Sequence, residues 1–258
     1  MAVYDTLGLV GLFVAAVVAG AINSVAGGGT LISFPSLVAF GEPDIISNAT
    51  NTAALWPGSL SSAVGYKKDT TVDRGLLVML IVPSFIGGLL GAVILVITPE
   101  STFRIVVPFL ILFATGLFAT RKTVARKLAM KTDQGQIKTI GRVWGFFFQL
   151  FVAAYGGYFG AGIGILMLGS LGVMGLRDVN VMNAMKTTLA AIINVTAFVF
   201  FAIKGLVVWP LALLMAVGAI VGGYVGARSA KHIRESYLQL LIVVVGLIIA
   251  MWFLMQLS

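Results

Sequence analysis

Hydrogen-bond donors, rather than acids or nucleophiles, are the residues of this sequence that could do chemistry. The stretch NSVAGGGT separates two apolar runs and combines three polar side chains with three consecutive glycines: Asn23, Ser24, Gly27, Gly28, Gly29 and Thr30. Glycine lets a chain turn tightly, and a helix that begins after the turn points free N–H groups and its positive dipole end into it. The stretch therefore predicts a helix break that binds an anion. The alternative is close helix packing through small residues.

A second group of polar residues occurs twice at helical spacing. Residues three and four apart are neighbours on a helix surface, so each set occupies one helix face. The sets are Asn48, Asn51 and Thr52 in the first half, and Asn183, Lys186, Thr187 and, two turns further on, Asn194 in the second. Polar side chains are costly in a bilayer, so we expect both faces to point into the protein and to bind substrate.

Lys186 is the most informative of these residues. It lies in the N-terminal part of an otherwise apolar segment, and no carboxylate of the sequence lies at a matching depth. A lysine that lacks a protein partner there would pair with an anionic substrate. The alternatives are that its side chain extends to the cytoplasmic interface or that it pairs with Asp178.

Several kinds of chemistry have no residues to support them. The sequence has no cysteine and one histidine, His232, which we expect at the solvated interface. It contains no metal-ligand cluster and no HExxH or GxSxG motif, so we expect neither an enzyme nor a metal or other cofactor. No acidic residue has to lie at mid-membrane, so the usual carboxylate relay for protons is missing. A coupling proton could travel on a weak-acid substrate, or sodium could bind to carbonyl and hydroxyl oxygens.

The composition indicates which elements must position these residues. Of 258 residues, 59% are hydrophobic and 10% are charged, and the mean hydropathy is +1.06. Soluble domains carry about 25% charged residues. Apolar runs of about 20 residues that do not alternate with polar ones predict an all-α polytopic membrane protein. Residues 1–22 lack a basic start and a cleavage site, and we interpret them as a retained helix.

The sequence repeats itself at a constant offset of 135 residues. Ala26–Gly29 aligns with Ala161–Gly164, and Asn48 aligns with Asn183. We divide the chain into a first repeat, 1–120, a basic linker, 121–142, and a second repeat, 143–258. Ten helical segments are predicted near 6–22, 30–40, 45–66, 74–97, 102–120, 143–157, 164–175, 179–203, 208–228 and 234–256. The second segment of each repeat is short, so eight to ten segments would cross the membrane.

Basic residues give the expected orientation, because cytoplasmic loops of membrane proteins are enriched in lysine and arginine. The linker holds seven of the 17 basic residues, so we place it in the cytoplasm and both termini outside. The net charge of +8 then reflects topology and not binding to nucleic acid. Five segments per repeat turn the second repeat upside down, as in many secondary transporters. The inverted axis would bring Gly162 and Gly164 toward the first glycine break near the midplane.

Two stretches carry a fairly specific pattern, AGAINSVAGGGTLISFPSLVAFG and SNATNTAALWPGSLSSAVGY, with a weaker FGAGIGILML in the second half. Along its whole length the chain resembles the sulfite exporter TauE/SafE family, also called the toluene-sulfonate uptake permease family. The family's motif corresponds to Asn23, Gly27, Gly28, Gly29, Pro35, Asn48, Asn51, Gly160, Gly162 and Gly164. The second half departs from the first at Ser170, which replaces Pro35, and at Lys186, which replaces Asn51. The resemblance implies transport of sulfite, sulfonates, sulfoacetate or thiosulfate across the bacterial inner membrane.

The residues and the resemblance agree on an anion as the substrate. We therefore expect a secondary transporter that moves small sulfur-containing anions by alternating access around a midplane site. Export is the expected direction, because acidic outer loops disfavour the capture of anions from outside. Three alternatives stay open: an anion channel of the same fold, a subunit that anchors or assembles a partner, and a carboxylate as substrate. A homo-oligomer in the lipid bilayer is also compatible with the sequence.

Overall fold

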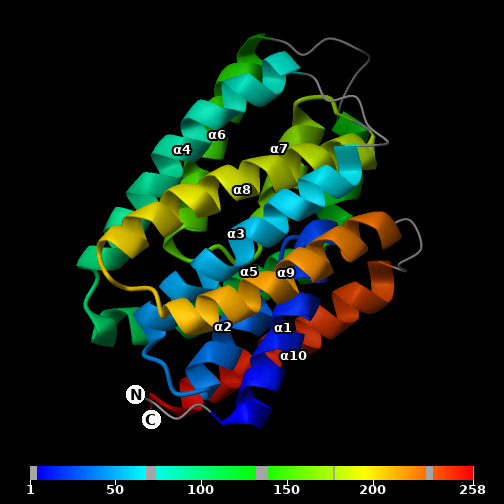
Figure 1. Cartoon of the computed structure of the whole chain (residues 1–258). Coiled ribbons are helices and arrows are strands. Elements are labelled where there is room, and N and C mark those ends of the chain that lie inside the picture. The colour runs from blue at the N-terminus through cyan, green and yellow to red at the C-terminus, as the bar shows by residue number, and fades with distance from the viewer. Residues whose placement is uncertain (1–4, 68–73, 132–138, 177, 231–234, 258) are drawn as a thin grey trace.

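The computed structural model describes residues 5–67, 74–131, 139–176, 178–230 and 235–257. Within these ranges the chain forms ten α-helices and no strand (Figure 1). The helices are α1 (Thr6–Val25), α2 (Thr30–Ala39), α3 (Asp44–Lys67), α4 (Arg74–Ile97), α5 (Glu100–Lys131), α6 (Thr139–Tyr158), α7 (Ile163–Val173), α8 (Val179–Ile203), α9 (Trp209–Ser229) and α10 (Glu235–Met255).

The helices agree with the ten predicted segments, with one correction at the centre of the chain. Helix α5 continues to Lys131 and α6 begins at Thr139, whereas the sequence analysis ended one segment at 120 and began the next at 143. The Lys, Arg, Ala and Leu residues there favour helix, so the helix continues beyond the apolar run. Residues 132–138 and His232 lie outside the described part of the chain. The division into two repeats and a linker stays a prediction.

Five of the described helices are long and apolar enough to cross a membrane: α1, α4, α5 over Glu100–Thr120, α8 and α9. Shorter apolar helices occur at Thr30–Ala39, Ile163–Gly172 and Gln239–Met255. Large apolar side chains are exposed along the long helices, as lipid contact requires, for example Phe109 and Leu213. Helix α3 is less apolar because it carries many Asn, Ser and Thr residues, and most of these are buried. The chain is therefore an all-α, multi-pass membrane protein.

Six helices pack in a row across the molecule, in the order α6, α4, α8, α3, α9 and α1, each in contact with the next. Figure 1 shows this row running from α4 and α6 at the top to α9 and α1 below. Exchanging each helix for the one 135 residues away reverses the row and preserves its contacts. The short helices follow the same rule, since α2 contacts α1, α3 and α10 while α7 contacts α6, α8 and α5. This packing supports a duplicated architecture. The orientation of each half in the membrane stays a prediction.

Glycines allow the closest helix contacts in this row. A Cβ added at Gly87 of α4 would lie 2.5 Å from the Leu150 carbonyl oxygen of α6. A Cβ added at Gly226 of α9 would lie 2.7 Å from Ala21 Cα of α1. Small residues let helix backbones approach closely where lipid offers no hydrophobic driving force. Gly87 and Gly226 are therefore packing residues of these helix contacts.

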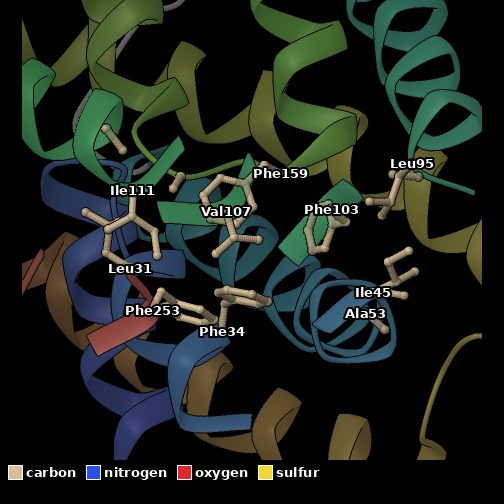
Figure 2. Close-up of a cluster of buried hydrophobic side chains, with 14 of the residues drawn as sticks. Leu31, Phe34, Ile45, Ala53, Leu95, Phe103, Val107, Ile111, Phe159 and Phe253 are labelled. Carbon is tan, nitrogen blue, oxygen red and sulfur yellow. The ribbon is translucent and has the colours of Figure 1, made fainter. Parts of the chain in front are cut away.

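An aromatic cluster packs α2 against the end of α6 (Figure 2). The Phe34 ring of α2 lies edge-on to the ring of Phe159, just after α6, with 5.4 Å between centroids. The same ring stacks on Phe253 of α10 at 5.8 Å. Phe103 of α5 completes the cluster, and all four side chains are buried. Because these rings come from both halves, they hold α2 and the end of α6 together.

Candidate functional site

The first helix break lies between the end of α1 and the start of α2. Gly27 has a left-handed backbone conformation, with φ of +82°. The Gly29 N–H donates a 2.7 Å hydrogen bond to Asn23 Oδ1, so Asn23 caps the entry to α2. The Leu31 and Ile32 amides donate to the Gly28 and Gly29 carbonyls. The sequence analysis expected these amides to point freely toward an anion, and three of them instead have partners within the break.

The second break lies between α6 and α7. Gly160 and Gly162 both have a positive φ, of +83° and +78°. The Tyr155 hydroxyl donates a 2.7 Å hydrogen bond to the Ala161 carbonyl oxygen, and this bond holds the loop from the α6 side. The two breaks therefore share glycine turns but are held by different side chains.

The two breaks meet at Gly27 and Gly164. A Cβ added at Gly164 would lie 2.5 Å from Gly27 Cα, 3.0 Å from the Ala26 carbonyl oxygen and 3.2 Å from Lys186 Cδ. A Cβ at Gly27 would likewise collide with the backbone of Gly164. Glycine is therefore required on both sides by close approach of the backbones. The structure brings together two segments that the sequence analysis expected to meet.

Lys186 lies directly beside this meeting point. Its side chain is 1% exposed, and its ammonium group donates hydrogen bonds of 2.9 Å to the Ser24 carbonyl oxygen and to Asn183 Oδ1. The expectation of a lysine without a protein partner is therefore wrong, because the end of α1 supplies a carbonyl. Extension to the cytoplasmic interface is also excluded by the burial. Both of these acceptor oxygens belong to uncharged groups. Asp178 caps the start of α8 through the amides of Asn180 and Val181.

The corresponding face of the first half has a different set of contacts. Asn48 Nδ2 donates a 2.8 Å hydrogen bond to the Tyr158 carbonyl oxygen. Asn51 Nδ2 lies 3.5 Å from Thr30 Oγ1, and Thr52 Oγ1 donates to the Asn48 carbonyl oxygen. Each face thus holds the end of the first helix of the opposite half.

A small pocket lies where these groups converge. The centre of a water molecule can occupy a volume of about 20 Å³ inside it. Its lining residues are Asn23, Gly27, Thr30, Ser59, Gly160, Ile163, Gly164, Lys186, Thr187, Ala190 and Asn194. A water molecule needs about 10–15 Å³ by this measure. The pocket in this conformation is therefore large enough for about one water molecule.

Seven of the residues proposed from the sequence line the pocket: Asn23, Gly27, Thr30, Gly164, Lys186, Thr187 and Asn194. The others are not among its lining residues: Ser24, Gly28, Gly29, Asn48, Asn51, Thr52, Gly162 and Asn183. Ser24 and Asn183 hold Lys186, while Gly28, Gly29 and Gly162 form the breaks. Asn48, Asn51 and Thr52 lie on the neighbouring face of α3.

Sequence reasoning missed four lining residues, namely Ser59, Gly160, Ile163 and Ala190, as substrate-site candidates. Ser59 carried a usable signal, because the offset of 135 residues aligns it with Asn194. Gly160 belonged to the pattern of the resemblance but was not chosen. Ile163 and Ala190 are apolar, and no residue type or spacing distinguished them from other membrane positions.

The pocket combines one buried cation with amide and hydroxyl groups. Lys186 contributes the charge, Asn23 and Asn194 contribute amides, and Ser59, Thr30 and Thr187 contribute hydroxyls. No acidic residue is among the lining residues that the structure describes. Charge-assisted hydrogen bonds of an ammonium group to an oxyanion are about twice as strong as neutral ones. The chemistry of the lining therefore suits a small anion.

Comparison with known proteins gives a consistent result. The family model described as "Sulfite exporter TauE/SafE" matches residues 12–253. A "Probable membrane transporter protein ORF9" from Sinorhizobium sp is 31% identical, over 93% of this chain and 89% of its own. A "Probable membrane transporter protein" from Haemophilus influenzae is 27% identical, over 91% and 90%. A "Probable membrane transporter protein YunE" from Bacillus subtilis is 26% identical, over 92% and 94%. No solved structure matches the chain.

Proposed function

The chain belongs to the sulfite exporter TauE/SafE family of membrane transporters, and from this premise we propose that it carries small sulfur-containing oxyanions through the pocket at Lys186. Sulfite, sulfonate, sulfoacetate and thiosulfate are the substrates of this class. The observation that carries the proposal is a buried ammonium group at the point where two broken helices meet. Irregular backbone at membrane depth is tolerated where it is buried or lines a cavity.

The architecture supports alternating access of two inverted halves. Exchanging the two halves preserves the contacts within the row of helices, and each half contributes residues of one helix break to the pocket. Two similar halves that face opposite ways can exchange conformations, which gives an outward-open and an inward-open state of similar energy. A pocket with room for about one water molecule would have to widen before a sulfur oxyanion enters.

The direction and the orientation are part of the same proposal. We place the chain in a bacterial inner membrane, with the basic linker on the cytoplasmic side. Both termini then lie on the outer side. Glu42 then lies in the outer loop between α2 and α3, and Asp44 and Glu100 lie at the outer ends of α3 and α5. These carboxylates would repel anions on the outer side and so disfavour their capture from outside. The repulsion extends about 8–10 Å before salt screens it. Export is therefore the proposed direction.

Flux in reconstituted liposomes tests the proposal. We expect purified protein to move labelled sulfite, sulfoacetate or thiosulfate, with faster flux when unlabelled anion is present on the opposite side. Replacing Lys186→Met removes the charge from the pocket and should lower flux at least about tenfold, since a charge-assisted hydrogen bond contributes roughly 1.5–3 kcal/mol. Lys204→Met is the matched control, because Lys204 lies exposed at the end of the same helix.

Each other outcome points to a different function. Flux without stimulation from the opposite side indicates a channel. Flux of a carboxylate but of no sulfur anion changes the substrate class and keeps the mechanism. No flux of any anion by folded protein contradicts the proposal and favours a subunit that anchors or assembles a partner. Unchanged flux in Lys186→Met contradicts the role of the lysine.

A further inference from the structure

Two buried amide oxygens in the first half have an unusual environment. Asn48 is fully buried and Asn51 is 1% exposed. Asn48 Oδ1 and Asn51 Oδ1 accept no hydrogen bond from any residue that the structure describes. Burying an acceptor oxygen without a hydrogen-bond partner costs the free energy of removing that oxygen from water. Buried oxygens in proteins are therefore generally bound by a protein donor, a water molecule or an ion.

The second half shows what lies at the corresponding place. The offset of 135 residues aligns Asn48 with Asn183 and Asn51 with Lys186. In the second half, Asn183 Oδ1 accepts a 2.9 Å hydrogen bond from the Lys186 ammonium group. In the first half, the residue three positions after Asn48 is Asn51 instead of a lysine. The first half therefore has the oxygen that accepts from the cation but lacks the covalently attached cation.

The ends of the helices repeat the same relation. The Lys186 ammonium group binds the Ser24 carbonyl oxygen in the last turn of α1. Asn48 binds the carbonyl oxygen of Tyr158, the last residue of α6, and α6 is the offset counterpart of α1. A helix C-terminus carries partial negative charge and stabilises a cation. Carbonyl oxygens at the ends of broken helices coordinate sodium in other transporter folds.

We propose that the first half binds a monovalent cation, Na⁺, through Asn48 Oδ1 and Asn51 Oδ1 at the end of α6. This ion would take the place that the Lys186 ammonium group holds in the other half. Neutral amide oxygens favour a monovalent ion, because proteins usually bind Ca²⁺ and Mg²⁺ with at least one carboxylate. Sodium bound by carbonyl and amide oxygens needs no acidic residue in the membrane.

The position of the site suggests what bound Na⁺ does. Thr30 accepts the contact from Asn51 Nδ2 and also lines the pocket at Lys186. A positive charge next to that pocket would raise its affinity for an anion, and by linkage the anion would raise the affinity for Na⁺ by the same factor. This consequence rests on the proposed transport of anions, whereas the binding of Na⁺ does not.

The first experiment measures Na⁺ binding by the purified full-length chain in nanodiscs, without any anion substrate. Radiolabelled Na⁺ should bind at about one ion per chain. At constant ionic strength, NaCl should raise the Tm by roughly 5 °C relative to choline chloride, as expected for a ligand that binds only the folded state. KCl and LiCl are parallel arms. A response equal in all four salts, or no binding of Na⁺, overturns the proposal.

A lysine at position 51 provides the sharpest test. Asn51→Lys copies Lys186 into the first half, and its ammonium group should lie against Asn48 Oδ1. We expect a folded protein whose Tm in choline chloride is at least that of the wild type and which no longer responds to Na⁺. A Na⁺ response that persists in Asn51→Lys overturns the proposal.

Two further variants keep the test decisive. If Asn51→Lys does not fold, Asn51→Asp adds a negative charge to the proposed ligand, and its affinity for Na⁺ should rise several-fold; a lower or unchanged affinity contradicts the site. Lys186→Met should lose anion flux and keep Na⁺ binding. Na⁺ binding without anion flux in the wild type would then reject the proposed function alone, and anion flux without Na⁺ binding would reject this site alone.

Discussion

The two halves of the molecule share a pattern of helix contacts but differ in charge at one position of their polar faces. Lys186 and Asn51 occupy the same place in the repeat. Lys186 binds the end of α1 and its neighbour Asn183, whereas Asn51 makes one long contact with Thr30. The pocket lies on the lysine side, since Lys186 and Thr187 line it while Asn51 and Thr52 do not. The two halves therefore share a pattern of helix contacts but differ in charge at this position.

The helix breaks differ in a similar way. The first break uses one left-handed glycine, Gly27, and an asparagine cap on Gly29. The second uses two left-handed glycines, Gly160 and Gly162, and the Tyr155 hydroxyl donates to the Ala161 carbonyl oxygen. The close approach of the two breaks is what the halves have in common. The side chains that hold each break could diverge because only the backbones have to meet.

The largest effect is expected where the comparison depends on that meeting point. Gly164→Val adds a branched side chain at this contact. The Cβ of the new valine would lie 2.5 Å from Gly27 Cα. Overpacking of this kind usually lowers the free energy of unfolding by about 1–3 kcal/mol. Because backbone atoms form the contact on both sides, we expect a loss at or above the upper end of this range. We expect little folded protein by size-exclusion chromatography and a clearly lower Tm.

Gly116→Val is the matched control for this prediction. A Cβ at Gly116 meets no atom within 4 Å, and valine is a slightly better helix former than glycine. Its Tm should equal or slightly exceed that of the wild type. If both variants behave alike, the meeting of the two breaks does not limit stability.

The second prediction makes the two halves alike. Lys186→Asn gives the second half the polar face of the first, with Asn183 Oδ1 left without the ammonium group. We expect anion flux to fall at least about tenfold, because the charge-assisted contact is lost. If the first half binds Na⁺ as proposed, this variant should bind a second Na⁺. Measurement of flux and of bound radiolabelled Na⁺ on the same preparation checks both effects. Wild-type flux in Lys186→Asn would show that the charge difference between the halves has no role in transport.

Much of the fold could be predicted because it depends on local patterns. Apolar runs set most helix bounds within a few residues, except the end of α5, which continues to Lys131 beyond its apolar run. The glycine clusters marked both breaks. The partner of Lys186 on α1 could not be predicted, because Ser24 lies 162 residues away and contributes only its carbonyl oxygen. Backbone atoms are the same at every position, so no residue type indicates them. Asn23 was expected to serve the ligand, yet its Oδ1 is used to cap Gly29.

The smallest effect is expected at a pair that the two halves contribute equally to the pocket. Ser59 and Asn194 are offset counterparts, and both line it. Ser59 Oγ donates to the Leu55 carbonyl oxygen of its own helix at 3.3 Å, so its hydroxyl proton is already used. The Asn194 amide has two N–H donors and can offer one to an anion.

Asn194→Ala should therefore raise the KM for flux several-fold, which corresponds to about 1 kcal/mol for one neutral hydrogen bond. Ser59→Ala should change the KM less than about twofold, because the Ser59 hydroxyl has no free proton to donate to the anion. Concentration-dependent flux of both variants at matched protein density measures the difference. If Ser59→Ala has the larger effect, the anion binds nearer to the first half than the position of Lys186 implies, and the asymmetry of the pocket would have to be assigned the other way round.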